Sequence, residues 1–118
     1  MPLPEFKQLV DEAKREIQEM GPDGLLQMRQ SGEDFTLIDV REPDEHAKGM
    51  IAGAVAMPRG ILERDIDQVT TDKGRRIVLY CAGGLRSALA ALNLKKMGFK
   101  NVVSLNGGYR GWVQSQGG

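Results

Sequence analysis

The segment from Ile77 to Gly98 limits the possible folds of this chain more than any other. Residues 77–80, all apolar or aromatic, predict a short buried strand. A loop with two glycines follows, and it opens with Cys81, the only cysteine in the sequence. Good helix formers then predict a helix that begins at Arg86 or Ser87 and ends at Gly98. A strand, a short loop and a helix in direct succession are the building unit of proteins with a parallel sheet.

This succession also predicts a loop that holds a reactive sulfur. The first N–H groups of a helix have no partner within it, and together with the helix dipole they favour a negative charge. The same field lowers a thiol pKa below its ordinary value of ~8.5, so we expect Cys81 to be largely thiolate near neutral pH. Arg86 adds a positive charge at the mouth of the loop. Ligands of parallel sheets bind at the carboxyl ends of the strands, which is where Cys81 is expected to lie. This position favours a nucleophilic role for Cys81 over a purely structural one.

Length and composition narrow the class of protein. The 118 residues suffice for a single domain (1–118). The charges of sixteen basic and sixteen acidic residues cancel, which argues against a nucleic acid or a membrane surface as partner. No apolar stretch spans a bilayer, and the N-terminus lacks the pattern of a signal peptide. A single cysteine excludes an internal disulfide and a cysteine-based metal site, so neither metal nor organic cofactor is implied. A free reactive thiol suits a reducing compartment, and we expect a cytoplasmic monomer.

The rest of the chain alternates predicted strands and helices. Further strands are expected at residues 16–20, 36–40, 54–56 and 101–105. Helical segments are expected at residues 1–15, 43–49 and 61–69, from Gly21 to a stop at residues 31–32, and from Gly111 onward, with a flexible tail at 114–118. Short apolar strands between helices predict an α/β fold, with a central, mostly parallel sheet of about five strands and helices on both faces.

Three separated motifs point to one family. They are LIDVRE at residues 37–42 with its continuation to GMIAGA at 49–54, CAGGLRS at 81–87, and LNGGYRGW at 105–112. In this order they resemble the first signature, the active-site loop and the C-terminal signature of the rhodanese family of thiosulfate sulfurtransferases. The resemblance extends over roughly residues 17–112 and implies the three-layer rhodanese-like fold.

The resemblance implies a double displacement through a persulfide on Cys81, with Arg86 as the second catalytic residue. The thiolate takes a sulfane sulfur from thiosulfate or a related persulfide donor and passes it to cyanide or a thiol acceptor. Asp39 and Arg41 are expected to support the site structurally, and His46 to be a packed or solvated side chain. Substrate binding is assigned to the loop residues and one further cation: Ala82, Gly83, Gly84, Leu85, Ser87 and Arg59.

Two positions depart from the family pattern. Met50 stands where the family commonly has histidine, which bears on local packing more than on chemistry. Leu85 stands where a small or polar residue is frequent. An apolar side chain at the rim is consistent with a larger, more apolar sulfur acceptor or with packing against a neighbouring residue. Gly107 and Gly108 are expected to form a tight turn near the site, and Trp112 to belong to the core.

Three other functions remain open at this stage. Dual-specificity phosphatases of this fold have a loop one residue longer than the six residues from Cys81 to Arg86, which argues against a phosphatase or arsenate reductase. A non-catalytic interaction module is disfavoured because the cysteine and its loop are intact. A persulfide carrier that passes sulfur to a protein partner would use the same loop. The sequence does not identify the physiological donor or acceptor.

Overall fold

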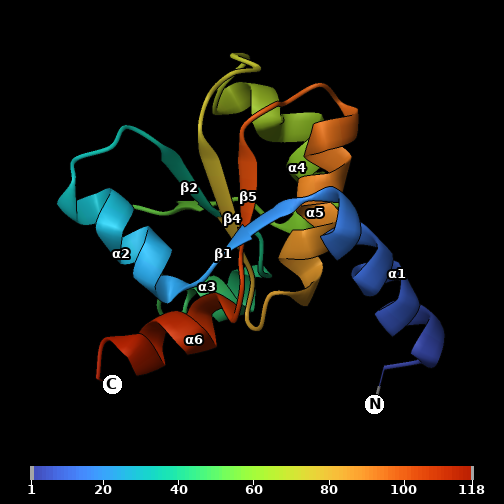
Figure 1. Ribbon diagram of the computed structural model, residues 1–118, viewed down its shortest axis with the longest axis horizontal. Helices are drawn as coiled ribbons and strands as arrows, with labels where there is room; N and C mark the ends of the chain where they lie inside the picture. Colours follow the sequence, from blue (N-terminus) through green and yellow to red (C-terminus); the bar gives the residue numbers. More distant parts are fainter. Residues whose placement is uncertain (1, 118) are drawn as a thin grey trace.

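Five parallel strands form the centre of the computed structural model, which describes residues 2–117 (Figure 1). In chain order they are β1 (Gln18–Met20), β2 (Thr36–Asp39), β3 (Val55–Ala56), β4 (Ile77–Tyr80) and β5 (Val102–Leu105). Their order across the sheet is β1-β5-β4-β2-β3, so β4 is the central strand. The predicted parallel sheet is confirmed, and all four neighbouring pairs are parallel.

Helices cover both faces of this sheet, which confirms the three-layer α/β arrangement. They are α1 (Pro4–Glu16), α2 (Pro22–Gln30), α3 (Pro43–His46), α4 (Arg59–Asp65) with the 3₁₀ turn η1 (Ile66–Gln68), α5 (Leu85–Lys96) and α6 (Gly108–Ser115). One face carries α4 and α5, the other carries α2 and α6, and α1 packs on the outside of α5 (Figure 1). Within residues 2–117, none of the helices has the length and apolarity to cross a membrane.

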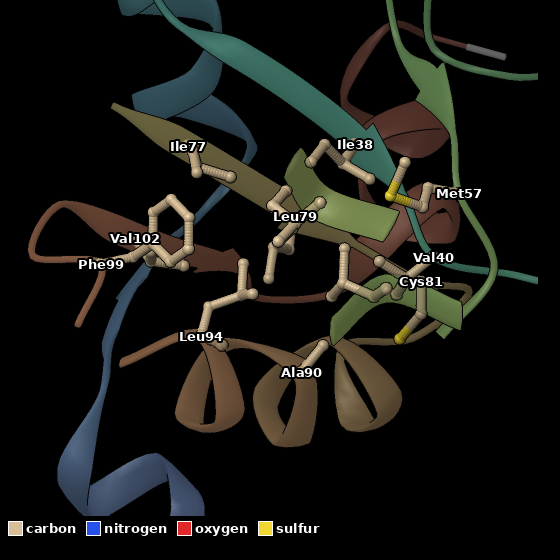
Figure 2. Close-up of a cluster of buried hydrophobic side chains, with 13 residues drawn as sticks. Ile38, Val40, Met57, Ile77, Leu79, Cys81, Ala90, Leu94, Phe99 and Val102 are labelled. Carbon is tan, nitrogen blue, oxygen red and sulfur yellow. The ribbon is translucent and has the colours of Figure 1, made fainter. Parts of the chain in front are cut away.

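The central strand is buried on both faces, and its side chains alternate between two cores. Ile77 and Leu79 belong to the cluster that includes Leu94 of α5, and Figure 2 shows Cys81 at one end of this cluster. Val78 and Tyr80 belong to the cluster on the opposite face, beneath α2 and α6. The strand that leads into the cysteine loop is therefore held from both sides.

Several boundaries differ from those predicted. β1 and β3 are shorter, and α5 begins at Leu85 because Gly84, at a φ of +97°, already turns the chain into the helix. The predicted start of the last helix at Gly111 is wrong by three residues, since α6 begins at Gly108. The predicted tail at 114–118 overlaps α6 as far as Ser115, and its last residue lies outside the described residues.

Candidate active site

Cys81 lies at the middle of the carboxyl edge of the sheet, where β4 ends and the loop to α5 begins. The residue is 1% exposed. Its sulfur accepts hydrogen bonds from the backbone N–H of Gly84 (3.1 Å) and of Ser87 (3.4 Å). The N-cap residue of α5, Gly84, forms no side-chain hydrogen bond to the helix. The Cys81 sulfur instead lies where a capping oxygen usually lies.

A pair of buried serines continues the hydrogen bonding behind the sulfur. The Ser87 hydroxyl lies 3.6 Å from Sγ of Cys81 and 2.8 Å from the Ser104 hydroxyl, which comes from β5. When the sulfur is a thiolate it accepts from Ser87, which in turn accepts from Ser104. The sequence motifs do not include Ser104, and only the pairing of β4 with β5 brings it here.

Two opposing effects set the pKa of the Cys81 thiol. Burial raises the pKa. Hydrogen bonds from the Ser87 N–H, the Ser87 hydroxyl and the N–H groups of Gly84 and Gly83 lower it, and together they outweigh the effect of burial. The net pKa lies below the ordinary value, as the sequence predicted. The largest favourable contributions come from Ser87 and the loop backbone, with no imidazole among them.

The first turn of α6 holds the outer side of the cysteine loop. The N–H of Tyr109 donates to the carbonyl of Cys81 (2.8 Å), and the N–H of Arg110 donates to the carbonyl of Ala82 (3.1 Å). These bonds turn the loop carbonyls toward α6 and leave its N–H groups free to face the sulfur. Gly108 permits this approach, because a β-carbon there would lie 2.7 Å from the carbonyl carbon of Ala82, at a φ of +57°.

Arg86 does not extend freely into solvent. Its guanidinium forms two hydrogen bonds, of 2.8 and 3.0 Å, with the carboxylate of Glu45 in α3. Arg86 lowers the pKa of Glu45 to about 2, and Glu45, with a smaller contribution from Cys81, raises the pKa of Arg86. The arginine that the sequence predicts as the second catalytic residue therefore has its charge compensated. No role was predicted for Glu45 from the sequence. The capping-box position of Glu45 in α3 is a signal that could have identified it.

Asp39 and Arg41 form a buried pair beside the site. Asp39 accepts the Arg41 backbone N–H (3.0 Å) and its guanidinium (2.7 Å). The guanidinium also donates to the carbonyl of Gly49 (2.6 Å) and lies 4.4 Å from the centroid of the Tyr109 ring. His46 lies close by, with Nε2 3.4 Å from the Asp39 carboxylate. The pair thus ties the end of β2 to the segment after α3 and to α6, which supports the structural role expected of it.

Leu85 and Arg59 are two further residues that the sequence assigned to substrate binding. Leu85, the first residue of α5, is 42% exposed and borders a groove of about 590 Å³ whose other wall is the start of α1, including Leu3 and Phe6. Arg59 begins α4, where its N–H donates to the carbonyl of Val40 (3.0 Å), and its Nε is buried without a hydrogen-bond partner. Met50 lies beside Tyr109 and Trp112.

Comparison with known proteins adds family evidence to this geometry. A model of the rhodanese-like domain matches residues 21–115. A sulfurtransferase of Allochromatium vinosum is 33% identical over 98 residues, which cover 83% of this chain and 90% of that protein. The putative sulfur carrier protein YrkF of Bacillus subtilis is 34% identical over 97 residues, covering 82% of this chain and 51% of that protein. The chain thus spans about half the length of that second relative.

One solved structure resembles nearly the whole chain. It is a protein of unknown function from Rhodopseudomonas palustris, described as a possible tyrosine phosphatase. It is 34% identical and has a TM-score of 0.84, covering 98% of this chain and 96% of the other. The likeness therefore extends over α1, which precedes the part matched by the family model.

Proposed function

The chain belongs to the rhodanese-like domain family, and from this we propose that it transfers a sulfane sulfur through a persulfide on Cys81. The donor is thiosulfate or a related persulfide, and the acceptor is a thiol or cyanide. The observation that carries the proposal is the sulfur of Cys81 at the start of α5, surrounded by the N–H groups of its own loop.

The proposed reaction has two displacements. The Cys81 thiolate attacks the outer sulfur of thiosulfate, a new S–S bond forms, and sulfite leaves with the electrons of the broken bond. The outer persulfide sulfur then bears the negative charge that the loop N–H groups stabilise. An acceptor thiolate attacks this sulfur, the S–S bond breaks, and the Cys81 thiolate is regenerated. Because the lowered pKa of Cys81 favours the thiolate, the proposal includes no general base.

The test is the intact mass of the reduced protein before and after brief exposure to thiosulfate, beside Cys81→Ser. We expect the wild type to gain one sulfur atom, to lose it on addition of cyanide, and the variant to gain none. If neither thiosulfate nor glutathione persulfide adds sulfur to the wild type, the proposal is wrong.

A persulfide carrier is the second candidate, favoured by the likeness to a putative sulfur carrier protein. It would use the same Cys81 persulfide but release the sulfur to a protein thiol. Loaded protein that turns over slowly with small thiols, and rapidly with one protein acceptor, would favour this role. A reactive thiol of this kind suits the cytoplasm, where we propose that the protein acts as a monomer.

The description of the Rhodopseudomonas palustris structure raises phosphatase activity as an alternative. The six-residue loop and the N–H bonds to a single sulfur atom favour a persulfide over a tetrahedral phosphate. We expect no hydrolysis of p-nitrophenyl phosphate by the wild type. Hydrolysis that depends on Cys81, without sulfur loading, would reverse this assignment.

A further inference from the structure

We propose that Arg110 forms an anion-binding subsite on the cysteine loop, where it takes the negatively charged group of the sulfur donor. The donor class this implies is an anionic sulfane-sulfur compound with a sulfonate or carboxylate beside the transferred sulfur. The assignment of the anion to the donor rests on the proposed function, whereas anion binding itself does not.

The guanidinium of Arg110 lies directly against the loop. A β-carbon placed on Gly83 would touch Nη2 of Arg110 and lie 3.4 Å from its Cζ. The same residue is anchored through its backbone, because its N–H donates to the carbonyl of Ala82 (3.1 Å). Gly83 is one of the residues whose N–H lowers the pKa of Cys81, so the guanidinium contacts the ring of atoms around the sulfur.

The guanidinium of Arg110 also differs from those of Arg86 and Arg41, whose charges are compensated. Arg86 is neutralised by its two bonds with Glu45, and Arg41 by its bonds with Asp39. None of the ion pairs formed among residues 2–117 involves Arg110, and its side chain is exposed. The guanidinium of Arg110 is therefore available to an anion that approaches Cys81, and it offers the forked geometry that sulfonates and carboxylates bind.

The absence of a side chain at residue 83 leaves the space that the guanidinium occupies. The φ of Gly83 is not positive, so the backbone conformation alone does not require glycine there. Any side chain would displace the guanidinium from the loop. Gly83 thus provides the space in which an arginine from α6 reaches the loop, and the two residues act as one unit.

The experiment uses two alkylating reagents that differ in charge, iodoacetate and iodoacetamide, with Cys81 as the only thiol. The readout is the ratio of their alkylation rates in the wild type, Arg110→Ala, Arg110→Lys and Arg15→Ala. Arg15 is an exposed arginine near the opposite end of α5, close to Lys95, and controls for the loss of one positive charge.

We expect Arg110→Ala to lower the iodoacetate-to-iodoacetamide ratio about tenfold, as one charge a few ångströms from the reacting anion predicts. Arg110→Lys should restore most of the ratio, and Arg15→Ala should leave it unchanged. Gly83→Ala should lower the ratio by displacing the guanidinium, with little further loss in the Gly83→Ala/Arg110→Ala double variant. An unchanged ratio in Arg110→Ala, or equal loss with both reagents, would overturn the proposal.

Loading with thiosulfate separates this inference from the proposed function. We expect Arg110→Ala to load sulfur about tenfold more slowly than the wild type, with a weaker dependence on salt. If the wild type takes no sulfur from any donor but the alkylation ratio still falls in Arg110→Ala, the subsite stands and the proposed function fails. If the wild type and Arg110→Ala load equally fast and their ratios agree, the function stands and the subsite is wrong.

Discussion

At the sulfur of Cys81, desolvation and hydrogen bonding act in opposite directions. The side chain is almost fully buried, which favours the neutral thiol, yet the net pKa is lowered. The N–H groups of Gly84 and Ser87 and the Ser87 hydroxyl therefore outweigh the cost of burial. This balance makes the reactivity of the sulfur depend on a few short contacts.

Ser87→Ala tests this balance, because it removes the hydroxyl and keeps the backbone N–H. We expect the midpoint of the pH–rate profile for alkylation by iodoacetamide to rise by about one pH unit, since a hydrogen bond to the thiolate is lost. The rate below the midpoint should fall, and the plateau at high pH should be retained. Ser104→Ala should raise the midpoint less, because Ser104 acts only through Ser87. A profile unchanged by Ser87→Ala would show that the backbone alone sets the pKa.

The residues around the sulfur that the sequence predicted are those that adjoin Cys81 along the chain. The loop from Ala82 to Ser87 surrounds the sulfur because consecutive residues cannot lie far apart. Ser104 and Arg110 were not assigned a role, since a strand pairing and a helix start bring them to the loop. The pairing of Arg86 with Glu45, 41 residues apart, was likewise not predictable from local spacing.

At the level of elements, α6 shapes the cysteine loop as much as α5 does. Its first two N–H groups after Gly108 bind the carbonyls of Cys81 and Ala82. The sequence predicted a tight turn at these glycines but placed the helix three residues too late. Glycine usually disfavours a helix. The hydrogen bonds to the loop carbonyls explain why α6 nevertheless begins at Gly108.

Gly108→Ala should therefore damage the site from outside the loop. The added β-carbon would meet the backbone of Ala82, at a φ that L-residues rarely adopt. We expect a loss of about 3 kcal/mol in the free energy of unfolding, together with a higher pKa of Cys81. The measurements are chemical denaturation and the alkylation profile.

Gly111→Ala is the matched control in the same helix. Its β-carbon would be 3.6 Å from Pro22, an ordinary contact, and alanine favours helix by up to about 1 kcal/mol. We expect unchanged or slightly higher stability and an unchanged alkylation profile. Equal losses in the two variants would contradict the role assigned to Gly108.

At the scale of the whole molecule, α1 adds a layer outside the part of the chain that the family model matches. Val10 and Ala13 pack on Ala88 of α5, within the first turns after the cysteine loop. The amphipathic pattern of this helix predicted its existence. The pattern did not predict which helix α1 would cover, because the apolar side of an amphipathic helix can pack on any apolar surface of the protein.

Substitutions at two neighbouring residues of α1 measure how much this helix contributes to the free energy of unfolding. Val10 is 2% exposed and Leu9 is 56% exposed. We expect Val10→Ala to lower the free energy of unfolding by about 2 kcal/mol, through lost burial and a small cavity. Leu9→Ala should change it by less than about 0.5 kcal/mol, as measured by denaturant unfolding of both variants. Equal effects would mean that α1 does not pack stably on α5.

The burial of Cys81 also bears on how the protein responds to oxidation by air. A thiolate at the surface would be oxidised and would join two molecules through a disulfide, which needs both sulfur atoms within bonding distance. A sulfur that is 1% exposed at the base of its loop cannot meet the equally deep sulfur of a second copy. The burial of Cys81 thus disfavours covalent cross-linking of two copies through this residue.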